Sequence, residues 1–249
     1  QSWHCGSDNH NQQLEQLHPE LKYYKILYES IYQTDILQQH NKKKRQASVL
    51  PVVFHVIHNN GPENIPDNRI IQALDWLNAS FENSSPYNAG GFNTGISFCL
   101  ANQSPDGAIT NGINRRVSSL TRLNKDVEDQ NLKDLIRWET KDYINIWIVD
   151  QISSNNGNNT VGYANLPGGH GSSYDGIVIE ANAVGLNKSS NIVLTHEMGH
   201  YLGLYHTFEQ GCLNDDCLAQ GDRVCDTPPD QVNHEGSCSV PVNSCMTDS

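Results

Sequence analysis

The sequence of 249 residues predicts an α+β fold, with a mixed twisted sheet, two main helices and an irregular disulfide-held C-terminal lobe. Short β-branched and aromatic segments alternate with segments of helical periodicity up to Gly203. Regular patterning then fades into a stretch rich in Asp, Gly and Pro that holds five of the seven cysteines. Residues 1–47 are rich in Gln, Asn, Lys and Tyr, which predicts a short separable N-terminal segment.

The N-terminal segment contains one helical pattern. After Pro19, four apolar or aromatic residues recur at helical spacing, namely Tyr24, Leu27, Tyr28 and Ile31. This spacing predicts a short amphipathic helix that lies on the main domain. A disordered tail is the alternative.

The main domain is expected to begin with a strand followed by a helix. The apolar run from Leu50 to Ile57 predicts the strand, and Asp67 is the expected cap of the helix. One face of that helix would carry Ile70, Ile71, Leu74, Leu77 and Phe81. Further strands are expected at residues 96–101, 143–149, 161–166 and 176–180, and residues 124–139 have mixed helical character.

The second main helix is expected to start near Ser189 or Ser190. It would turn Ile192, Val193 and Leu194 toward the core.

Composition excludes two classes of partner. Sixteen basic and 28 acidic residues give a net charge of −12, so the chain is not expected to bind nucleic acid. The longest apolar run, residues 49–57, is far shorter than the roughly 20 residues of a membrane-spanning helix. No membrane span is therefore predicted.

The cysteine-rich lobe predicts disulfides and an oxidising, extracellular compartment. A zinc-binding cysteine cluster is the alternative, but the lobe has no repeated C-x-x-C pair. We expect the pairs Cys212–Cys245 and Cys217–Cys225, with Cys238 left without a partner.

The strongest signal for chemistry lies around residue 200. His196 and His200 stand one helical turn apart, so both imidazoles can reach one zinc ion at about 2.0–2.1 Å. Glu197 then projects beside the metal. Gly203 can adopt a positive φ that ends the helix and brings back His206 as a third ligand. Three ligands predict a single catalytic zinc ion with one open position.

An open zinc site suits hydrolysis, because zinc polarises a scissile carbonyl and lowers the pKa of its bound water toward about 7. Glu197 is the expected general base, which takes the proton of that water and passes it to the leaving amine. Core or surface histidines are the plain alternative, but they leave Glu197 unexplained. A closed structural zinc site would need a fourth protein ligand in place of the water.

The segment from His196 to His206 resembles the elongated zinc motif of metzincin metallopeptidases. The continuation His-Thr-Phe at residues 206–208 and Gly-Asp-Arg-Val-Cys-Asp-Thr-Pro-Pro at residues 221–229 resembles the pappalysin family. Residues 50–58 and 161–168 also resemble bacterial members of that family. The resemblance implies a metzincin-like zincin catalytic domain at residues 48–249, preceded by a pro-segment at residues 1–47.

The family resemblance implies a secreted zinc endopeptidase that cleaves internal bonds of protein or peptide substrates. A substrate would add as an extended strand to an exposed sheet edge, for which residues 162–166 are the candidate. Family members also bind calcium near the loop after the third histidine. Asp222, Asp226 and Thr227 offer oxygen ligands there, although Asp-rich turns are often only solvated.

The sequence departs from the metzincin pattern at the methionine-containing turn under the zinc. Pappalysins place this turn in a segment resembling Asn-Tyr-Met-Asp-Tyr, beyond the position of Cys245. Met246 lies in the different context Cys-Met-Thr-Asp. The chain is therefore expected to be truncated before its Met-turn, without the side wall of the S1′ pocket.

The N-terminal segment is expected to keep the enzyme latent. Cys5 lies in His-Cys-Gly-Ser-Asp, which resembles the cysteine switch of matrixin zymogens, and its thiolate would take the zinc position that water needs. The alternatives are a disulfide to Cys99, otherwise expected as a buried free thiol, and Asp8 as the blocking ligand. The expected activation cleavage region lies between Arg45 and Ser48.

Two other functions stay open from the sequence. A zinc aminopeptidase would have to anchor a free amino terminus, and most zincins with that role use Glu as third ligand, where this chain has His206. A non-catalytic zinc-dependent adhesin or inhibitor module is the other alternative. The intact Glu197 argues against it.

Overall fold

The computed structural model describes residues 4–38, 47–88, 91–157, 160–231 and 245. It divides into two compact units: residues 3–201 form the first, and residues 202–249 with residues 1–2 form the second. All helices and strands of the described residues lie in the first unit.

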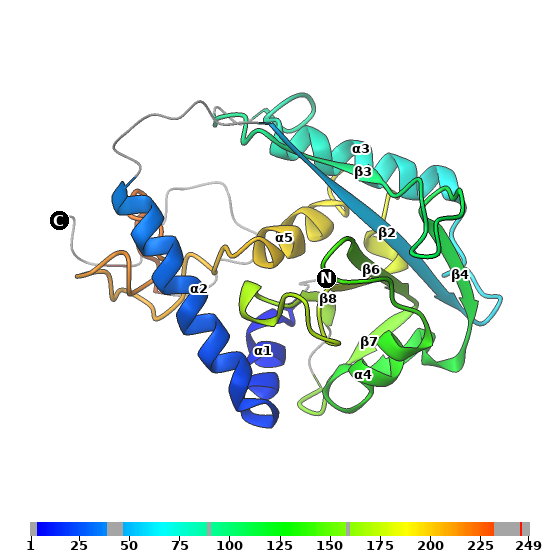
Figure 1. Ribbon diagram of the computed structural model, residues 1–249, viewed down its shortest axis with the longest axis horizontal. Coiled ribbons are helices and arrows are strands. Elements are labelled where there is room, and N and C mark those ends of the chain that lie inside the picture. The colour runs from blue at the N-terminus through cyan, green and yellow to red at the C-terminus, as the bar shows by residue number, and fades with distance from the viewer. Residues whose placement is uncertain (1–3, 39–46, 89–90, 158–159, 232–244, 246–249) are drawn as a thin grey trace. The chain divides into compact units, whose positions relative to one another are not determined.

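The first unit is built on a mixed β-sheet whose main path is β3-β2-β6-β9-β8-β7-β5 (Figure 1). The strands on this path are β2 (Ser48–His58), β3 (Ile96–Leu100), β5 (Arg122–Asn124), β6 (Ile144–Val149), β7 (Gln151–Ser153), β8 (Thr160–Ala164) and β9 (Ile177–Glu180). Only β8 runs antiparallel to its neighbours on this path, β7 and β9. The five expected strands are confirmed as β2, β3, β6, β8 and β9.

Strand β2 organises one side of the sheet. Its first half pairs with β3, and its second half pairs with β4 (Ile113–Val117). The other edge of β2 pairs with β6. The apolar run from Val52 to Ile57 is fully buried, as expected for a strand covered on both faces. The sequence Ile-Asn-Arg-Arg-Val of β4 lacks such a run, and this strand was not predicted.

The two expected main helices are α3 (Asp67–Phe81) and α5 (Ile192–Tyr201), and Figure 1 shows α3 alongside β3. The residue that caps α3 is Pro66, so the expected cap was wrong; the Asp67 carboxylate pairs with Arg115 instead. Ile71 and Ile192 were wrongly expected to face the core, since their side chains are 47% and 48% exposed. The expected helical segment 124–139 contains α4 (Lys125–Leu135).

The N-terminal segment forms β1 (His4–Cys5), α1 (Ser7–Leu17) and α2 (Pro19–Gln38). The expected helix after Pro19 is confirmed, but its expected buried face is wrong. Tyr24, Leu27, Tyr28 and Ile31 are 53%, 44%, 37% and 54% exposed. Helix α2 instead packs on the short 3₁₀ turn η2 (Pro167–Gly169), and among its described side chains Leu21 is buried.

In the second unit, residues 202–231 and 245 contain no helix or strand. Disulfides join Cys212 to Cys245 and Cys217 to Cys225, which confirms both expected pairs. Cys238 lies outside the described residues. Gly203 has a φ of 102°, which agrees with the positive φ expected after the zinc-motif helix.

Ser48, where the catalytic domain is expected to begin, is the first residue of β2, and the boundary between pro-segment and catalytic domain stays a prediction. Ser48 pairs with Ile96 of β3, and its amide donates to the Gly95 carbonyl at 2.8 Å. Arg45 lies outside the described residues. Within the described ranges, none of the helices has the length and apolar character needed to cross a bilayer.

Candidate active site

Helix α5 presents the first two predicted zinc ligands. The Nε2 atoms of His196 and His200 lie 3.0 Å apart, and the two rings are perpendicular. Two nitrogens bound to one tetrahedral zinc at 2.0–2.1 Å would lie about 3.3 Å apart. The imidazole pair therefore fits a zinc ion with little adjustment.

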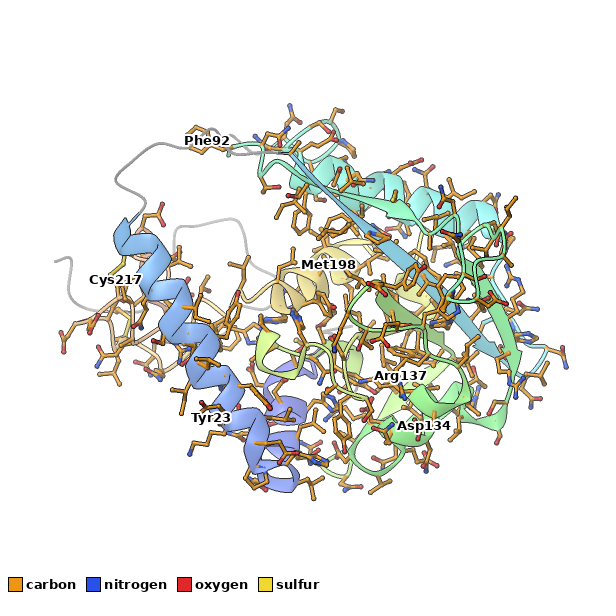
Figure 2. All side chains as sticks on the ribbon, in the orientation of Figure 1. Tyr23, Phe92, Asp134, Arg137, Met198 and Cys217 are labelled. Atoms are coloured by element: carbon orange, nitrogen blue, oxygen red, sulfur yellow. A yellow bond between two sulfur atoms is a disulfide. The ribbon has the colours of Figure 1, made fainter. Side chains whose placement is uncertain are left out.

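Helix α5 is anchored by apolar residues that lie close in sequence to its predicted zinc ligands and Glu197. Leu194 and Met198, the latter visible on α5 in Figure 2, are fully buried and hold the helix against the sheet. Glu197 is also fully buried and lies beside β8. A Cβ atom at Gly162 of β8 would lie 3.0 Å from Glu197 Cγ, so glycine leaves the room that this carboxylate needs.

The N-terminal segment brings Cys5 to the same place. The ligand atoms of Cys5, His196 and His200 lie within 4.8 Å of one another, and the Cys5 thiol donates to Glu197 Oε2 at 3.7 Å. Burial and the Glu197 carboxylate raise the pKa of the Cys5 thiol, whereas a bound metal cation favours the thiolate. Two imidazoles and a thiol are ligands that zinc accepts.

Cys5 and Cys99, for which a disulfide was one alternative, differ in exposure. Cys5 and Cys99 are both free, so the alternative disulfide between them does not form. Cys99 was expected to be buried and is exposed instead. Strand β3 lies at the end of the sheet path, and its alternation turns Phe98 inward and Cys99 outward.

Strand β1 adds to the edge of β8. His4 and Cys5 pair with Thr160 and Gly162 in a parallel arrangement, and the Gly6 amide donates to the Gly162 carbonyl at 2.9 Å. A Cβ atom at Gly6 would lie 2.6 Å from Thr160 Cγ2. A glycine at this position therefore permits the close approach.

Helix α1 continues the occupation of this edge with side chains. The Ser7 hydroxyl donates to Glu197 Oε2 at 2.8 Å and accepts from the Ala164 amide at 2.9 Å. The Asn11 amide donates to the Ala164 carbonyl at 2.9 Å and accepts from the Leu166 amide at 3.0 Å. The sheet edge expected to bind substrate is thus covered by the N-terminal segment.

For five predicted residues the ligand role stays a prediction. His206 lies in the second unit, so its role as third ligand stays a prediction. Asp222 Oδ1 accepts from the Val224 amide at 3.0 Å, and in the described part of the chain neither Asp222 nor Asp226 joins a cluster of three metal-ligand side chains. Asp8 is exposed at the start of α1. Calcium binding by Asp222, Asp226 and Thr227 stays a prediction.

Comparison with known proteins agrees with this geometry. Residues 126–249 match the model of peptidase family M43, which is described as Pregnancy-associated plasma protein-A. The chain is similar to an extracellular metalloprotease of Verticillium alfalfae, with 26% identity over 79% of this chain and 64% of the relative. It is also similar to extracellular metalloprotease 1 of Coccidioides posadasii, with 40% identity over 33% of this chain and 22% of the relative. The chain thus spans less than two thirds of the length of these curated relatives.

Solved structures of higher coverage come from Tannerella forsythia. A promirolysin mutant superposes with a TM-score of 0.68 at 28% identity, over 90% of this chain and 76% of promirolysin. Mature mirolysin in complex with a cleaved peptide gives a TM-score of 0.61 at 29% identity, over 75% of this chain and 73% of mirolysin. Together with the family match and the histidine pair on α5, these similarities show that the chain carries a metallopeptidase domain of the pappalysin family.

Proposed function

We propose that this chain is a secreted zinc-dependent endopeptidase in latent form, kept inactive by residues 1–47 through Cys5. The observation that carries the proposal is the Cys5 thiol beside the His196 and His200 imidazoles, within 4.8 Å. The family supplies the metal-dependent chemistry. The extracellular naming of the curated relatives and the two disulfides support secretion.

In the active form, His196, His200 and His206 would hold the zinc ion. When bound, zinc polarises the scissile carbonyl and lowers the pKa of the attacking water. The Glu197 carboxylate accepts the proton of that water as its oxygen attacks the carbonyl carbon. When the carbon–nitrogen bond breaks, Glu197 returns the proton to the leaving amine nitrogen.

Strand β8 would orient the substrate. The Gly162 and Ala164 carbonyls and the Ala164 and Leu166 amides are the edge groups that the N-terminal segment now engages. An extended peptide could pair with the same groups through its main chain. Such pairing on both sides of the scissile bond favours cleavage of internal bonds over removal of an amino-terminal residue. A relative, mature mirolysin, has been solved in complex with a cleaved peptide.

Latency would arise from three contacts of the same short segment. Cys5 would take the zinc position that water needs, since its thiol lies within 4.8 Å of the histidine ligand atoms. Ser7 would hold the general base through its 2.8 Å hydrogen bond to Glu197. Gly6 and Asn11 cover the β8 edge against substrate. Cleavage between Arg45 and Ser48 would cut the covalent link between this segment and β2 and allow it to leave.

Calcium is proposed as a second, structural cofactor of the second unit. Asp222, Asp226 and Thr227 fall within the segment that matches the family model and offer the oxygen ligands that calcium prefers. Asp222→Asn should lower the melting temperature measured in calcium and leave that in chelator unchanged. An equal shift in both conditions would contradict a calcium site.

X-ray absorption at the zinc edge tests the latent ligand set. The unprocessed chain should show one sulfur at about 2.3 Å and three nitrogens at about 2.0–2.1 Å. Cys5→Ala should replace the sulfur with a light atom, while the matched Cys99→Ala should not, because Cys99 is exposed and lies on β3. A sulfur-free shell in the parent chain would overturn the switch.

Activity assays test the enzyme class. Chain processed near Arg45 should cleave an internally quenched peptide whose amino terminus is blocked. Cys5→Ala should do so without processing. Cleavage restricted to peptides with a free amino terminus would identify an aminopeptidase instead.

A further inference from the structure

A histidine of the N-terminal segment lies deep in its contact with the enzyme. His10 of α1 is 2% exposed, and its ring packs on Tyr163 of β8 with centroids 4.5 Å apart. Its Nε2 atom lies 3.7 Å from Asp129 Oδ2 on α4 and has no hydrogen-bond partner among the described residues. Release of α1 would transfer this imidazole from a buried site to water.

The charges around His10 are already balanced. On α4, the Asp129 carboxylate lies 3.0 Å from Lys133 Nζ and accepts from the Tyr163 hydroxyl at 2.7 Å. Lys125 and Asp126, also on α4, pair at 2.7 Å. The groups facing His10 are therefore two carboxylates and two ammonium groups from α4 and a neutral phenol from β8. A protonated imidazole would add an uncompensated buried charge.

We propose that His10 makes the N-terminal segment an acid-released inhibitor, which opens in mildly acidic solution by taking up one proton at this imidazole. This inference concerns regulation of the latent site and rests on the proposed function. It assigns to α1 a second task beyond blocking Glu197.

The sign and size of the effect follow from linkage. Burial lowers the pKa of His10 to about 3, from its ordinary 6.5. Since a released His10 titrates near 6.5, opening binds a proton between these two values, and the closed state loses stability as the pH falls below 6.5. The opening equilibrium constant should rise by about tenfold for each pH unit below 6.5 and change little above it. Between pH 7.5 and 5.5, proton uptake by His10 therefore contributes about tenfold.

The two groups that contact His10 directly, Asp129 and Tyr163, keep their protonation state in this window. Burial acts to raise the pKa of Asp129, but Lys133 and the other neighbours lower it overall, so this carboxylate stays ionised. Burial raises the pKa of Tyr163 well above its ordinary value, so the phenol stays neutral.

Thiol labelling of the zinc-loaded full chain measures the opening. A pyridyl disulfide reacts with thiols throughout this pH range, and the exposed Cys99 provides an internal reference for its reactivity. Release of Cys5 from zinc takes up a proton at the thiol in every variant, so the His10 effect is read against a non-titrating variant. The labelling rate of Cys5 divided by that of Cys99, read by peptide mapping, should rise from pH 7.5 to 5.5 about tenfold more in the parent chain than in that variant. Zinc content is measured at each pH, and only fully loaded samples are compared.

The matched variant is His10→Phe, which keeps an aromatic ring against Tyr163 and cannot titrate. Its labelling ratio should rise about tenfold less than that of the parent chain over the same range, because in this variant only the Cys5 thiol takes up a proton on release. An equal rise in the parent chain and in His10→Phe would overturn the proposal. If His10→Phe does not close at pH 7.5, His10→Gln replaces it as the non-titrating variant.

The result is separable from the proposed endopeptidase activity. A rise about tenfold larger in the parent chain than in His10→Phe supports acid release even if no peptide is cleaved. Labelling of Cys5 as fast as Cys99 at every pH would overturn the closed state itself and with it this inference.

Discussion

The two helices of the N-terminal segment contact the rest of the first unit in opposite ways. Helix α1 is the more polar, yet it buries Ser7 and His10 along with Leu14. Helix α2 carries more apolar residues and leaves Tyr23 and Ile26 exposed, and Figure 2 shows Tyr23 on α2. Hydrophobicity therefore does not identify which helix contacts the active site, because the polar helix α1 makes those contacts.

The physical reason lies in what each contact demands. Buried polar groups are costly unless their partners are placed correctly, so Ser7 and Asn11 fix α1 in one register on β8. Helix α2 makes a less demanding contact through Leu21 and through close packing of Lys25 on Gly168. An ion pair of 2.8 Å between Lys25 and Glu15 links α2 back to α1. We infer that α2 braces α1.

The largest expected effect tests whether α1 covers a working catalytic carboxylate. Glu197→Ala should lower the activity of processed chain by 10² to 10⁴-fold, as expected for loss of a general base. Zinc content should stay at the parent level, since the histidine ligands are unchanged. Peptide hydrolysis and elemental analysis measure the two quantities. Retained activity above about a hundredth would assign the base elsewhere and leave the Ser7 contact without an inhibitory role.

The second prediction concerns a substitution that weakens the contact of β1 and α1 with β8. In Gly6→Ala, the new Cβ would lie 2.6 Å from Thr160 Cγ2, so β1 must move away from β8. Overpacking of this kind costs about 1–3 kcal/mol, which should raise the activity of unprocessed chain by about 5 to 150-fold. Gly91→Ala is the control, because its Cβ would meet nothing closer than 3.9 Å. Unchanged latency in Gly6→Ala would contradict the close β1–β8 pairing.

Local signals in the sequence were sufficient to predict the catalytic helix. Helical spacing alone places His196, His200 and Glu197 together, because these residues lie within two turns of one helix. The strands with continuous apolar runs were found for the same reason. Strand β4 and the exposure of α2 were not predicted, because their environment depends on neighbours distant in the sequence.

The contacts of the N-terminal segment with the active site were only partly predictable. Cys5 was found through its resemblance to a known switch segment, whereas Ser7, His10 and Asn11 have no local signal. Ser7 and Glu197 are separated by 190 residues, and no spacing rule connects them. The same limit applies to Cys99, whose exposure depends on the position of β3 at the end of the sheet path.

The third prediction concerns a substitution that weakens the contact of α2 with the η2 turn. In Gly168→Ala, the new Cβ would lie 2.9 Å from the Lys25 backbone, so α2 must move from the η2 turn. If α2 acts on the active site through α1, as we infer, unprocessed activity should rise by about two- to fivefold, which corresponds to at most about 1 kcal/mol. Processed chain lacks α2 and should match the parent. A rise as large as that of Gly6→Ala would make α2 an equal partner in inhibition.

The smallest effect is expected on the exposed face of α2. Tyr23 is 65% exposed and contacts the neighbouring ring of Tyr24 with centroids 5.7 Å apart. Surface substitutions away from buried features usually change stability by no more than about 0.5 kcal/mol. Tyr23→Ser should therefore alter both the unprocessed activity and the denaturant midpoint by little, with activity changed by about twofold at most. A larger loss of latency would show that this aromatic face stabilises the closed state, and α2 would then inhibit through its apolar residues as α1 does through its polar ones.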